Sequence, residues 1–363
     1  MSSIRPLERN DLPAVVELYE RAMRSGRPDP PPGLAPYFER TLVDYPGADP
    51  EIPSLVYEGS DGRILGFIGS HVRRLRFDGE PIRMGCSGQL VSDPAQRRLA
   101  VGAKLLRSYM SGPQDLTITD GGTDVVHQMW ERLGGHILQP SSMVWIRLLR
   151  PFRAVGDLWL QRGNGRERWR APSTPVLSAL DKATTKLTRP PLPDAAVETE
   201  ELSARALLEH ESEAFGEARL RADYDEPFVE WLFDEMAAVR SRGRLVRRLV
   251  RRDGALLGWY VTHMKPGGLS RVVEVAATKG AMDSVLDRLF TDAWQSGVAA
   301  LEGRLEPALF EPFLRRRCFV IHGPRALFHS RDPELVAAIS LGASGLTRLD
   351  GESWMGHHSE PFR

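Results

Sequence analysis

Apolar and polar residues follow two periods along the first 150 residues of this chain. Short stretches with a period of two, bounded by turn residues such as Asp-Gly, predict strands. These stretches are residues 3–7, 54–58, 64–76, 82–91, 116–119 and 143–149. Apolar residues with a period of 3.6 predict helices between the strands. The predicted helices cover residues 12–23, 36–45, 99–110 and 123–133.

A similar pattern returns in the second half of the chain. Asp253-Gly254-Ala255-Leu256-Leu257-Gly258-Trp259 repeats the residue types of Asp61-Gly62-Arg63-Ile64-Leu65-Gly66-Phe67. Two predicted helices, over residues 203–215 and 227–238, precede this repeat, and strands and helices alternate after it. Between the halves lies a stretch rich in Gly, Pro and Arg, which is typical of a linker. The sequence therefore predicts two modules, residues 1–150 and 197–363, joined by a linker over residues 151–196.

Composition excludes several classes of protein. Acidic and basic residues balance at 48 each among 363 residues, which argues against a nucleic-acid partner and against a basic membrane anchor. We find no run of the roughly 18 apolar residues that a membrane span needs, and no signal-peptide core. The two cysteines, Cys86 and Cys318, lie far apart, so we expect no disulfide framework and no metal site. We expect a cytoplasmic protein, and its oligomeric state stays open.

The stretch from Gln89 to Met110 carries the strongest functional signal. A strand-like run ends at Pro94, a polar loop carries Arg97 and Arg98, and small residues then open a helix. The first N–H groups of a helix are unpaired and carry a partial positive charge, so they suit an anion. Small residues let a phosphate approach the backbone, and arginines add charge-assisted hydrogen bonds.

This stretch resembles the acetyl-CoA pyrophosphate loop of the GCN5-related N-acetyltransferases, whose pattern is R/Q-x-x-G-x-G/A. Residues 97–102 read R-x-x-A-x-G, with alanine where glycine is usual, and Leu105-Leu106 follows as in that family. The order of predicted elements over residues 1–150 is also similar to the family's. The resemblance implies an α/β (α+β) fold of two tandem modules, each a twisted mixed central sheet flanked by helices. It also implies acetyl-CoA as donor substrate, bound by Leu90, Val91, Arg97, Arg98, Leu99, Ala100, Val101, Gly102, Ala103 and Trp130.

Trp130 marks the main departure from the family. There a tyrosine, two or three residues before Gly-Phe, commonly protonates the leaving thiolate, whereas this chain reads Trp130-Glu131-Arg132-Leu133-Gly134-Gly135. An indole N–H cannot supply a proton at neutral pH. We therefore interpret Trp130 as a wall of the thioester channel. Tyr109 in the preceding helix is more often a packing residue than a replacement acid.

Three residues are candidates for the acceptor side of the reaction. Asp120, at the end of a strand, would orient an ammonium or act as base, although a turn or cap is the more common role of such a residue. His127 would reach the site from the next helix, although an exposed helical histidine is more common. Gln89 shares one strand face with Ser87 if the alternation is regular, and Cys86 then points to the opposite face as a buried thiol.

The resemblance implies an N-acetyltransferase that uses the first module. Residues 278–282 lack the loop spacing, so we expect the second module to have lost acetyl-CoA binding. The acceptor would be a primary amine of a small molecule or a peptide, attacking the thioester directly. Two alternatives stay open: an acyl-CoA-binding or regulatory protein without catalysis, and an aminoacyl transferase of the peptidoglycan-bridge type. Neutral charge and the intact first loop count against the second alternative.

Overall fold

The computed structural model describes residues 2–24, 29–154, 177, 180–181, 188–191, 193–306, 309–357 and 359–362. The side chains of Arg97, Arg98 and Pro140 lie outside this description, as does most of the predicted linker 151–196. The chain divides into two compact units. Unit 1 contains residues 1–139, 217–241 and 324–363, and unit 2 contains residues 140–216 and 242–323.

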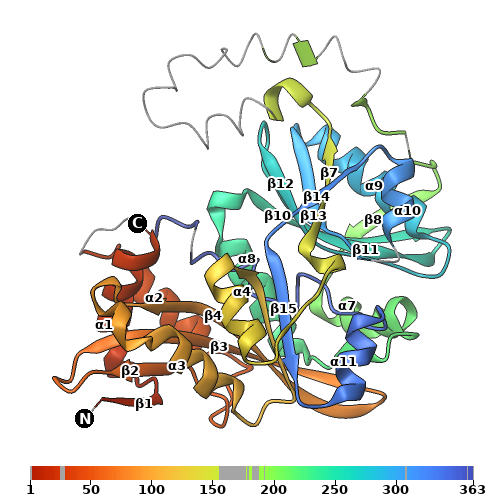
Figure 1. The fold of residues 1–363 in the computed structure, drawn as a ribbon. Helices are drawn as coiled ribbons and strands as arrows, with labels where there is room; N and C mark the ends of the chain where they lie inside the picture. Colours follow the sequence, from red (N-terminus) through yellow and green to blue (C-terminus); the bar gives the residue numbers. More distant parts are fainter. Residues whose placement is uncertain are drawn as a thin grey trace. The chain divides into compact units, whose positions relative to one another are not determined.

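Unit 1 is built on an eight-stranded sheet (Figure 1). Its strands are β1 (Ser3–Pro6), β2 (Leu55–Glu58), β3 (Ile64–Phe77), β4 (Glu80–Ser92), β5 (Leu116–Gly122), β6 (His136–Ile137), β9 (Leu220–Ala222) and β15 (Arg325–Ser330). Their order is β1-β2-β3-β4-β5-β15-β6, and β9 pairs with β3. Only β4 and β5 run parallel among these pairs, and the others are antiparallel.

Helices cover both faces of this sheet, because successive side chains of a strand point to opposite faces. The helices are α1 (Leu12–Tyr19), α2 (Leu34–Phe38), α3 (Val101–Met110), α4 (Asp124–Arg132), α8 (Glu226–Ala238) and α11 (Pro333–Ser340). Phe67 of β3 packs in a cluster with α1 and α2. Its neighbour Ile68 packs in a second cluster with α3 and α4.

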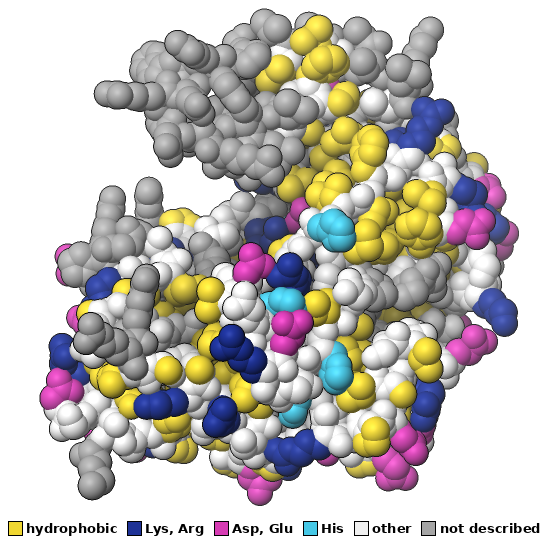
Figure 2. All heavy atoms as spheres, in the orientation of Figure 1, with side chains coloured by type: hydrophobic (Ala, Val, Ile, Leu, Met, Phe, Trp, Pro, Cys, Tyr) yellow, Lys and Arg dark blue, Asp and Glu magenta, His cyan; other side chains and the backbone are white. Residues whose placement is uncertain are grey.

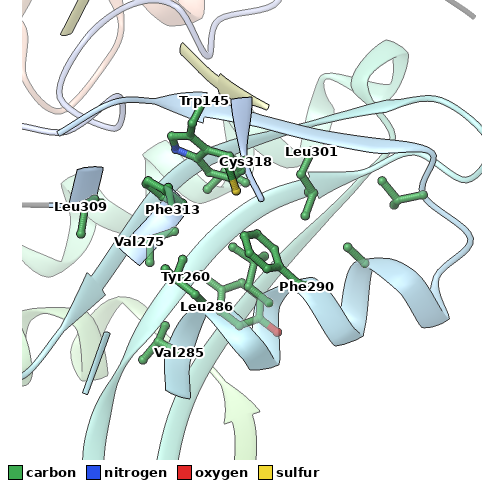
Figure 3. Close-up of a cluster of buried hydrophobic side chains, with 14 of the residues drawn as sticks. Trp145, Tyr260, Val275, Val285, Leu286, Phe290, Leu301, Leu309, Phe313 and Cys318 are labelled. Carbon is green, nitrogen blue, oxygen red and sulfur yellow. The ribbon is translucent and has the colours of Figure 1, made fainter. Parts of the chain in front are cut away.

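Unit 2 has a seven-stranded sheet of its own. Its elements are β7 (Met143–Leu148), β8 (Val197–Glu201), α7 (Ala204–Phe215), β10 (Arg244–Arg252), β11 (Ala255–Met264), β12 (Leu269–Ala277), α9 (Met282–Gln295), β13 (Ala300–Arg304), α10 (Phe310–Arg315) and β14 (Phe319–His322). Figure 3 shows its core, where Trp145 stacks on Phe313 with ring centroids 4.3 Å apart, and Phe290 of α9 lies beside them.

The two sheets have the same topology, which confirms the predicted fold class of two mixed sheets flanked by helices. Read from β8, the second sheet is ordered β8-β10-β11-β12-β13-β7-β14, with its only parallel pair, among the described strands, at β12 and β13. The two Asp-Gly hairpins also agree in register. Gly66 lies opposite Tyr57 and Gly258 opposite Val250, and each register shifts one residue later.

The strand after β6 differs from the prediction. Residues 143–149 were predicted to close the first module, but β7 pairs with β13 and β14 of unit 2. The corresponding place in the first sheet, between β5 and β6, is taken by β15 from the C-terminal part of the chain. In Figure 1 the yellow β7 accordingly lies among cyan and blue strands. An apolar pattern predicts that a strand forms, whereas its partner depends on long-range packing.

The predicted limits of the modules, residues 1–150 and 197–363, therefore differ from those of the two units. A further segment, residues 217–241, also belongs to unit 1 although it was predicted in the second module. It contributes β9 to the edge of β3, and α8, whose Trp231 packs against Tyr45 with ring centroids 5.3 Å apart. The alternating apolar face of α8 predicts a helix without indicating which sheet it covers.

Charged side chains of both signs are interspersed on the face shown in Figure 2, as the balanced composition leads one to expect. Among the described helices, every one is too short or too polar to cross a bilayer. The described residues also hold no group of three or more His, Cys, Asp or Glu side chains arranged for a metal ion.

Candidate active site

Strands β4 and β5 separate in the middle of the sheet of unit 1. Their parallel pairing covers only Met84–Cys86 on β4 and Leu116–Ile118 on β5. Both strands continue, to Ser92 and Gly122 respectively, beyond the last described pair. The strands thus diverge before the loop that leads to α3, and their edges are available to other groups there.

A β-bulge lies in β4 at this point. The register with β3 shifts between Phe67 and Gly69, and Gln89 has a left-handed backbone with φ of +50°. A bulge adds one residue to one strand and breaks the alternation of its side chains. Gln89 therefore faces His71, with Oε1 3.1 Å from Nε2 of that ring, while Ser87 Oγ donates to the carbonyl of Ile118.

Because of the bulge, the side chains of this strand point in directions that differ from those expected. Gln89 and Ser87 do not share the predicted face, because the extra residue interrupts the period of two. Cys86 was expected opposite Gln89, but both contact the C-terminal tail, which we define as residues 341–357. Cys86 Sγ donates to the Asp350 carbonyl at 3.3 Å, and Gln89 Nε2 lies 3.1 Å from Nδ1 of His357. Burial raises the pKa of the Cys86 thiol well above its ordinary value, so it stays protonated, as expected of a structural thiol.

The tail binds to β5 where this strand diverges from β4. Asp120 Oδ2 accepts hydrogen bonds from the N–H groups of Glu352 (3.1 Å) and Ser353 (3.2 Å). In return, Glu352 Oε1 accepts from Thr119 Oγ1 (2.8 Å) and from the N–H of Asp120 (3.0 Å). Asp120 lies within β5, so it is neither a turn residue nor a helix cap. Its carboxylate instead holds the tail on the strand.

A buried polar cluster fixes the preceding residues of the tail. The Arg73 guanidinium, which is 1% exposed, donates to the Gly351 carbonyl at 3.4 Å and lies 5.2 Å from the ring centre of Phe228. Tyr224 donates to Asp350 Oδ1 at 2.6 Å. Burial raises the pKa of Asp350, although its hydrogen bonds from Tyr224 and Thr347 oppose the shift. Four separate parts of unit 1 thus converge on residues 350–353.

The predicted pyrophosphate loop forms a 3₁₀ segment, η4 (Pro94–Leu99), directly followed by α3. Ala100 is the N-cap residue of α3 and supplies no side-chain hydrogen bond to it. The first-turn N–H groups of Val101, Gly102 and Ala103 therefore receive no cap from that side chain. Among the described residues outside the backbone of α3, a Cβ added at Gly102 would meet Ser92 Oγ alone, at 3.9 Å, so these residues leave the space above this turn open.

Ala100 shows why the family prefers glycine at this position. Its backbone is left-handed, with φ of +49° and ψ of +39°, and this conformation costs an L-residue roughly 1–2 kcal/mol. The sequence suggested that alanine is acceptable because it is small. The structure shows that conformation, more than size, distinguishes the two residues here.

Ala100→Gly should raise the free energy of unfolding by about 0.5–1 kcal/mol. The substitution removes the left-handed penalty of roughly 1–2 kcal/mol but adds the backbone entropy cost of glycine, about 0.5–1 kcal/mol. Urea unfolding measures the change. Ala103→Gly, inside α3, is the matched control and should lower stability by about 1 kcal/mol. An Ala100→Gly variant as destabilised as the control would contradict the assigned backbone.

The remaining candidates lie on α4 or next to it. His127 Nε2 is 3.3 Å from Glu131 Oε1 on the same helix, and Nδ1 is 3.4 Å from Arg325 Nη1. Trp130 is 1% exposed and packs in the apolar cluster under α3 and α4, so it lines no channel in this conformation. Tyr109 is also buried, and its hydroxyl pairs with Ser70 Oγ at 2.8 Å.

The backbone groups near Leu90 and Val91, which the resemblance implies for the thioester, lie at the end of β4, after the bulge. The Leu90 side chain packs with α3 and the Val91 side chain packs with α1, so the two side chains lie on opposite faces of the sheet. The residues that the sequence reasoning missed are Arg73, His71, Glu352 and His357. An apolar Trp354-Met355 pair inside a polar C-terminal segment was the available signal that this segment docks on the fold.

The corresponding helix start in unit 2 is occupied differently. Asp283 lies in the first turn of α9, where it accepts hydrogen bonds from Arg315 (3.2 Å) and Arg316 (2.5 Å). Partial burial raises the pKa of Asp283, but these arginine hydrogen bonds outweigh it and hold the pKa below its ordinary value. A carboxylate already balances the positive end of this helix.

Solved structures of the same fold cover most of this chain. The alignment with a probable N-acyltransferase from Enterococcus faecalis covers 91% of this chain and 73% of the other chain, with a TM-score of 0.59 and 10% identity. A GCN5-related N-acetyltransferase from Kribbella flavida matches 94% and 73%, with a TM-score of 0.54 and 14% identity. Eis1 from Mycobacterium abscessus matches 93% and 76%, with a TM-score of 0.55 and 14% identity.

No protein-family model and no curated protein sequence matches the chain. The chain has the fold of the GCN5-related N-acetyltransferases, and the predicted resemblance is confirmed at the level of the fold. At these identities the likeness carries no information about the acceptor or about which module reacts.

Proposed function

We propose that the protein is an acetyl-CoA-dependent N-acetyltransferase whose reaction takes place in unit 1. The observation that carries this proposal is the divergence of β4 from β5 immediately before η4 and the open start of α3. A helix start without a side-chain cap suits a pyrophosphate. The space between two diverging strands suits an extended chain that needs backbone hydrogen-bond partners, such as pantetheine.

In this proposal the donor and the acceptor approach from opposite layers of the sheet. Backbone N–H groups near Leu90 and Val91 would polarise the thioester carbonyl, as the resemblance to the family implies. A primary amine of a small molecule or a peptide would attack it directly. The buried Cys86 thiol supports direct attack, because a protonated thiol without a base is a poor nucleophile. Unit 2 would bind no acetyl-CoA, since Asp283 would repel the pyrophosphate.

Gly102→Glu should abolish acetyl-CoA binding while the protein stays folded. The added carboxylate projects into the open space above the first turn of α3, where it repels the pyrophosphate without meeting another group. Calorimetry should find one site per chain in the unmodified protein and none in the variant. Gly102→Ala is the matched control, because a methyl group fits the same space, and it should bind normally. Unchanged affinity in Gly102→Glu, or two equivalent sites per chain, would contradict the proposal.

A further inference from the structure

Glu352 is the carboxylate that the tail places between the two diverging strands. Its Oε1 is hydrogen-bonded to Thr119 and Asp120 of β5. On the other side, a Cβ built at Gly88 of β4 would lie 3.7 Å from the Cγ of Glu352, which is ordinary van der Waals distance. The residue is 7% exposed. The side chain therefore spans the gap at the level where β4 carries its bulge.

We propose that Glu352 is the catalytic base of unit 1, the group that takes the proton from the ammonium of the acceptor. The proposal rests on the proposed function and names a residue for it. Strand β4 offers no carboxylate of its own beside the bulge, since residues 86–89 read Cys-Ser-Gly-Gln. The tail supplies one at that place, where Thr119 and Asp120 hold its Oε1 by hydrogen bonds.

The other groups around the site are less suited to accept a proton. Both hydrogen bonds to the Asp120 carboxylate come from backbone N–H groups of the tail, so we assign this residue to positioning the tail. Burial and the charge of Arg73 lower the pKa of His71 to about 3, so its ring holds a proton poorly at neutral pH. The amide of Gln89 does not titrate, and His127 pairs with Glu131 on α4.

The reaction balances with Glu352 as the first proton acceptor. The acceptor ammonium gives one proton to the carboxylate, and the free amine attacks the thioester carbonyl carbon. The N–C bond forms, the C–S bond breaks, and the second proton of the attacking nitrogen goes to the leaving thiolate. Glu352 then returns its proton to water. The products are an N-acetyl amine, CoA as the thiol and one proton released, with no oxidant or further co-reactant.

Several titratable groups interact with Glu352, namely Cys86 on β4, Tyr109 on α3 and Asp120 on β5. Four more charged or titratable residues belong to the same polar region: His71 and Arg73 on β3, and Asp350 and His357 in the tail. The pH dependence of turnover must therefore be compared between variants of Glu352 itself, because one profile alone would contain all of these groups.

The test compares Glu352→Gln and Glu352→Asp with Glu360→Gln. The Gln variant keeps an oxygen that accepts from Thr119 and Asp120, so the tail stays in place, but it cannot take a proton. Glu360, which accepts from the Ser241 N–H at 2.9 Å, is the matched control for the same change of charge near the C-terminus. Acetyl-CoA binding is measured by calorimetry. Release of CoA thiol is measured from pH 5 to 9 with histamine, spermidine and a lysine-containing peptide.

We expect all four proteins to bind acetyl-CoA equally. Glu352→Gln should lower kcat/KM by about 10²–10⁴-fold, the usual effect of a lost general base, and should lose the fall in rate at low pH. Glu352→Asp should keep that fall while losing up to about 10²-fold, because its carboxylate is displaced by about 1 Å. Glu360→Gln should match the unmodified protein.

Two results would overturn the assignment while leaving the proposed function intact. One is a Glu352→Gln rate equal to that of the control, and the other is an unchanged low-pH limb in that variant. Failure of the unmodified protein to bind acetyl-CoA would instead overturn the proposed function itself. Binding without turnover of any amine of the panel counts against both.

Discussion

Acidification from pH 6.5 to pH 5 should lower the free energy of unfolding by about 2 kcal/mol through His71 alone. Burial, and after it the charge of Arg73, lowers the pKa of this histidine from 6.5 to about 3 in the folded protein. Below pH 6.5 the unfolded chain therefore binds a proton that the folded chain does not. Each pH unit in that range removes about 1.4 kcal/mol of stability, and the loss continues until the folded pKa is reached.

Both ring nitrogens of His71 lie near an oxygen atom, so a neutral ring requires the amide of Gln89 to be turned over. Nδ1 lies 3.0 Å from the Thr41 carbonyl and therefore carries the ring proton, while Nε2 faces the amide of Gln89. A neutral ring then needs a donor at Nε2, which the amide group of Gln89 provides when its NH₂ group is turned towards His71. Protonation would replace this arrangement by a buried cation next to Arg73, and among the described residues neither ring nitrogen is hydrogen-bonded to a carboxylate.

The test compares the free energy of unfolding of the unmodified protein with that of His71→Asn, measured with urea at pH 7, 6 and 5. The asparagine amide can donate to Thr41 but does not titrate, so the stability difference between the two proteins should shrink by about 2 kcal/mol from pH 7 to pH 5. His136→Asn, at an exposed position on β6, is the control and should show no such change. A stability difference for His71→Asn that is independent of pH would show that the pKa of His71 in the folded protein is close to its ordinary value.

Local patterns in the sequence were sufficient for part of this structure. The Asp-Gly hairpins, the strand into Pro94 and the helix after Ala100 all follow from alternation and turn chemistry, which act between near neighbours. The repeat of residues 61–67 at 253–259 predicted a second sheet of similar order, and the two sheets agree even in the register shift after each hairpin.

Pairing between distant segments could not be predicted in the same way. Strands β7 and β15 each contain a short apolar run, so nothing local assigns β7 to the second sheet and β15 to the first. Gly88 in the strand pattern was a local signal for the bulge, but the left-handed residue is its neighbour Gln89, which bears the conformational cost. A regular alternation was the reasonable expectation, and it placed Ser87 and Gln89 on one face.

The acceptor side of the site was the least predictable part. Asp120 was selected because it ends a strand before two glycines, and it does lie at the divergence of β4 and β5. Its partners, however, come from residues 352 and 353, more than two hundred positions later. The carboxylate that the site uses in our proposal is likewise in the tail, where no neighbouring motif marks it as functional.

Trp130 shows both what the local sequence predicts and what depends on long-range packing. The resemblance marks Trp130 as a departure from the family's tyrosine, and the structure gives it a core position in place of a channel wall. A Cβ built at Gly135 would lie 2.8 Å from its ring, so the indole uses the space that a side chain at residue 135 would need. The large residue at 130 and the glycine at 135, where the family has phenylalanine, therefore compensate for each other in volume.

Trp130→Ala should consequently lower the free energy of unfolding by about 3–5 kcal/mol, as large-to-small changes in a packed core do. Trp130→Phe should cost less, and Trp130→Tyr should cost about 1–3 kcal/mol more than Phe if its hydroxyl stays buried without a partner. Urea unfolding measures all three variants. In the Phe variant, turnover per folded protein should fall by less than the roughly 10²–10⁴-fold that loss of a general acid usually causes. In the Tyr variant, turnover should not exceed that of the unmodified protein. A Tyr variant that turns over faster than the Phe variant and is equally stable would contradict the core position. Its hydroxyl would then lie close to the sulfur of the thioester, and residue 130 would line the channel.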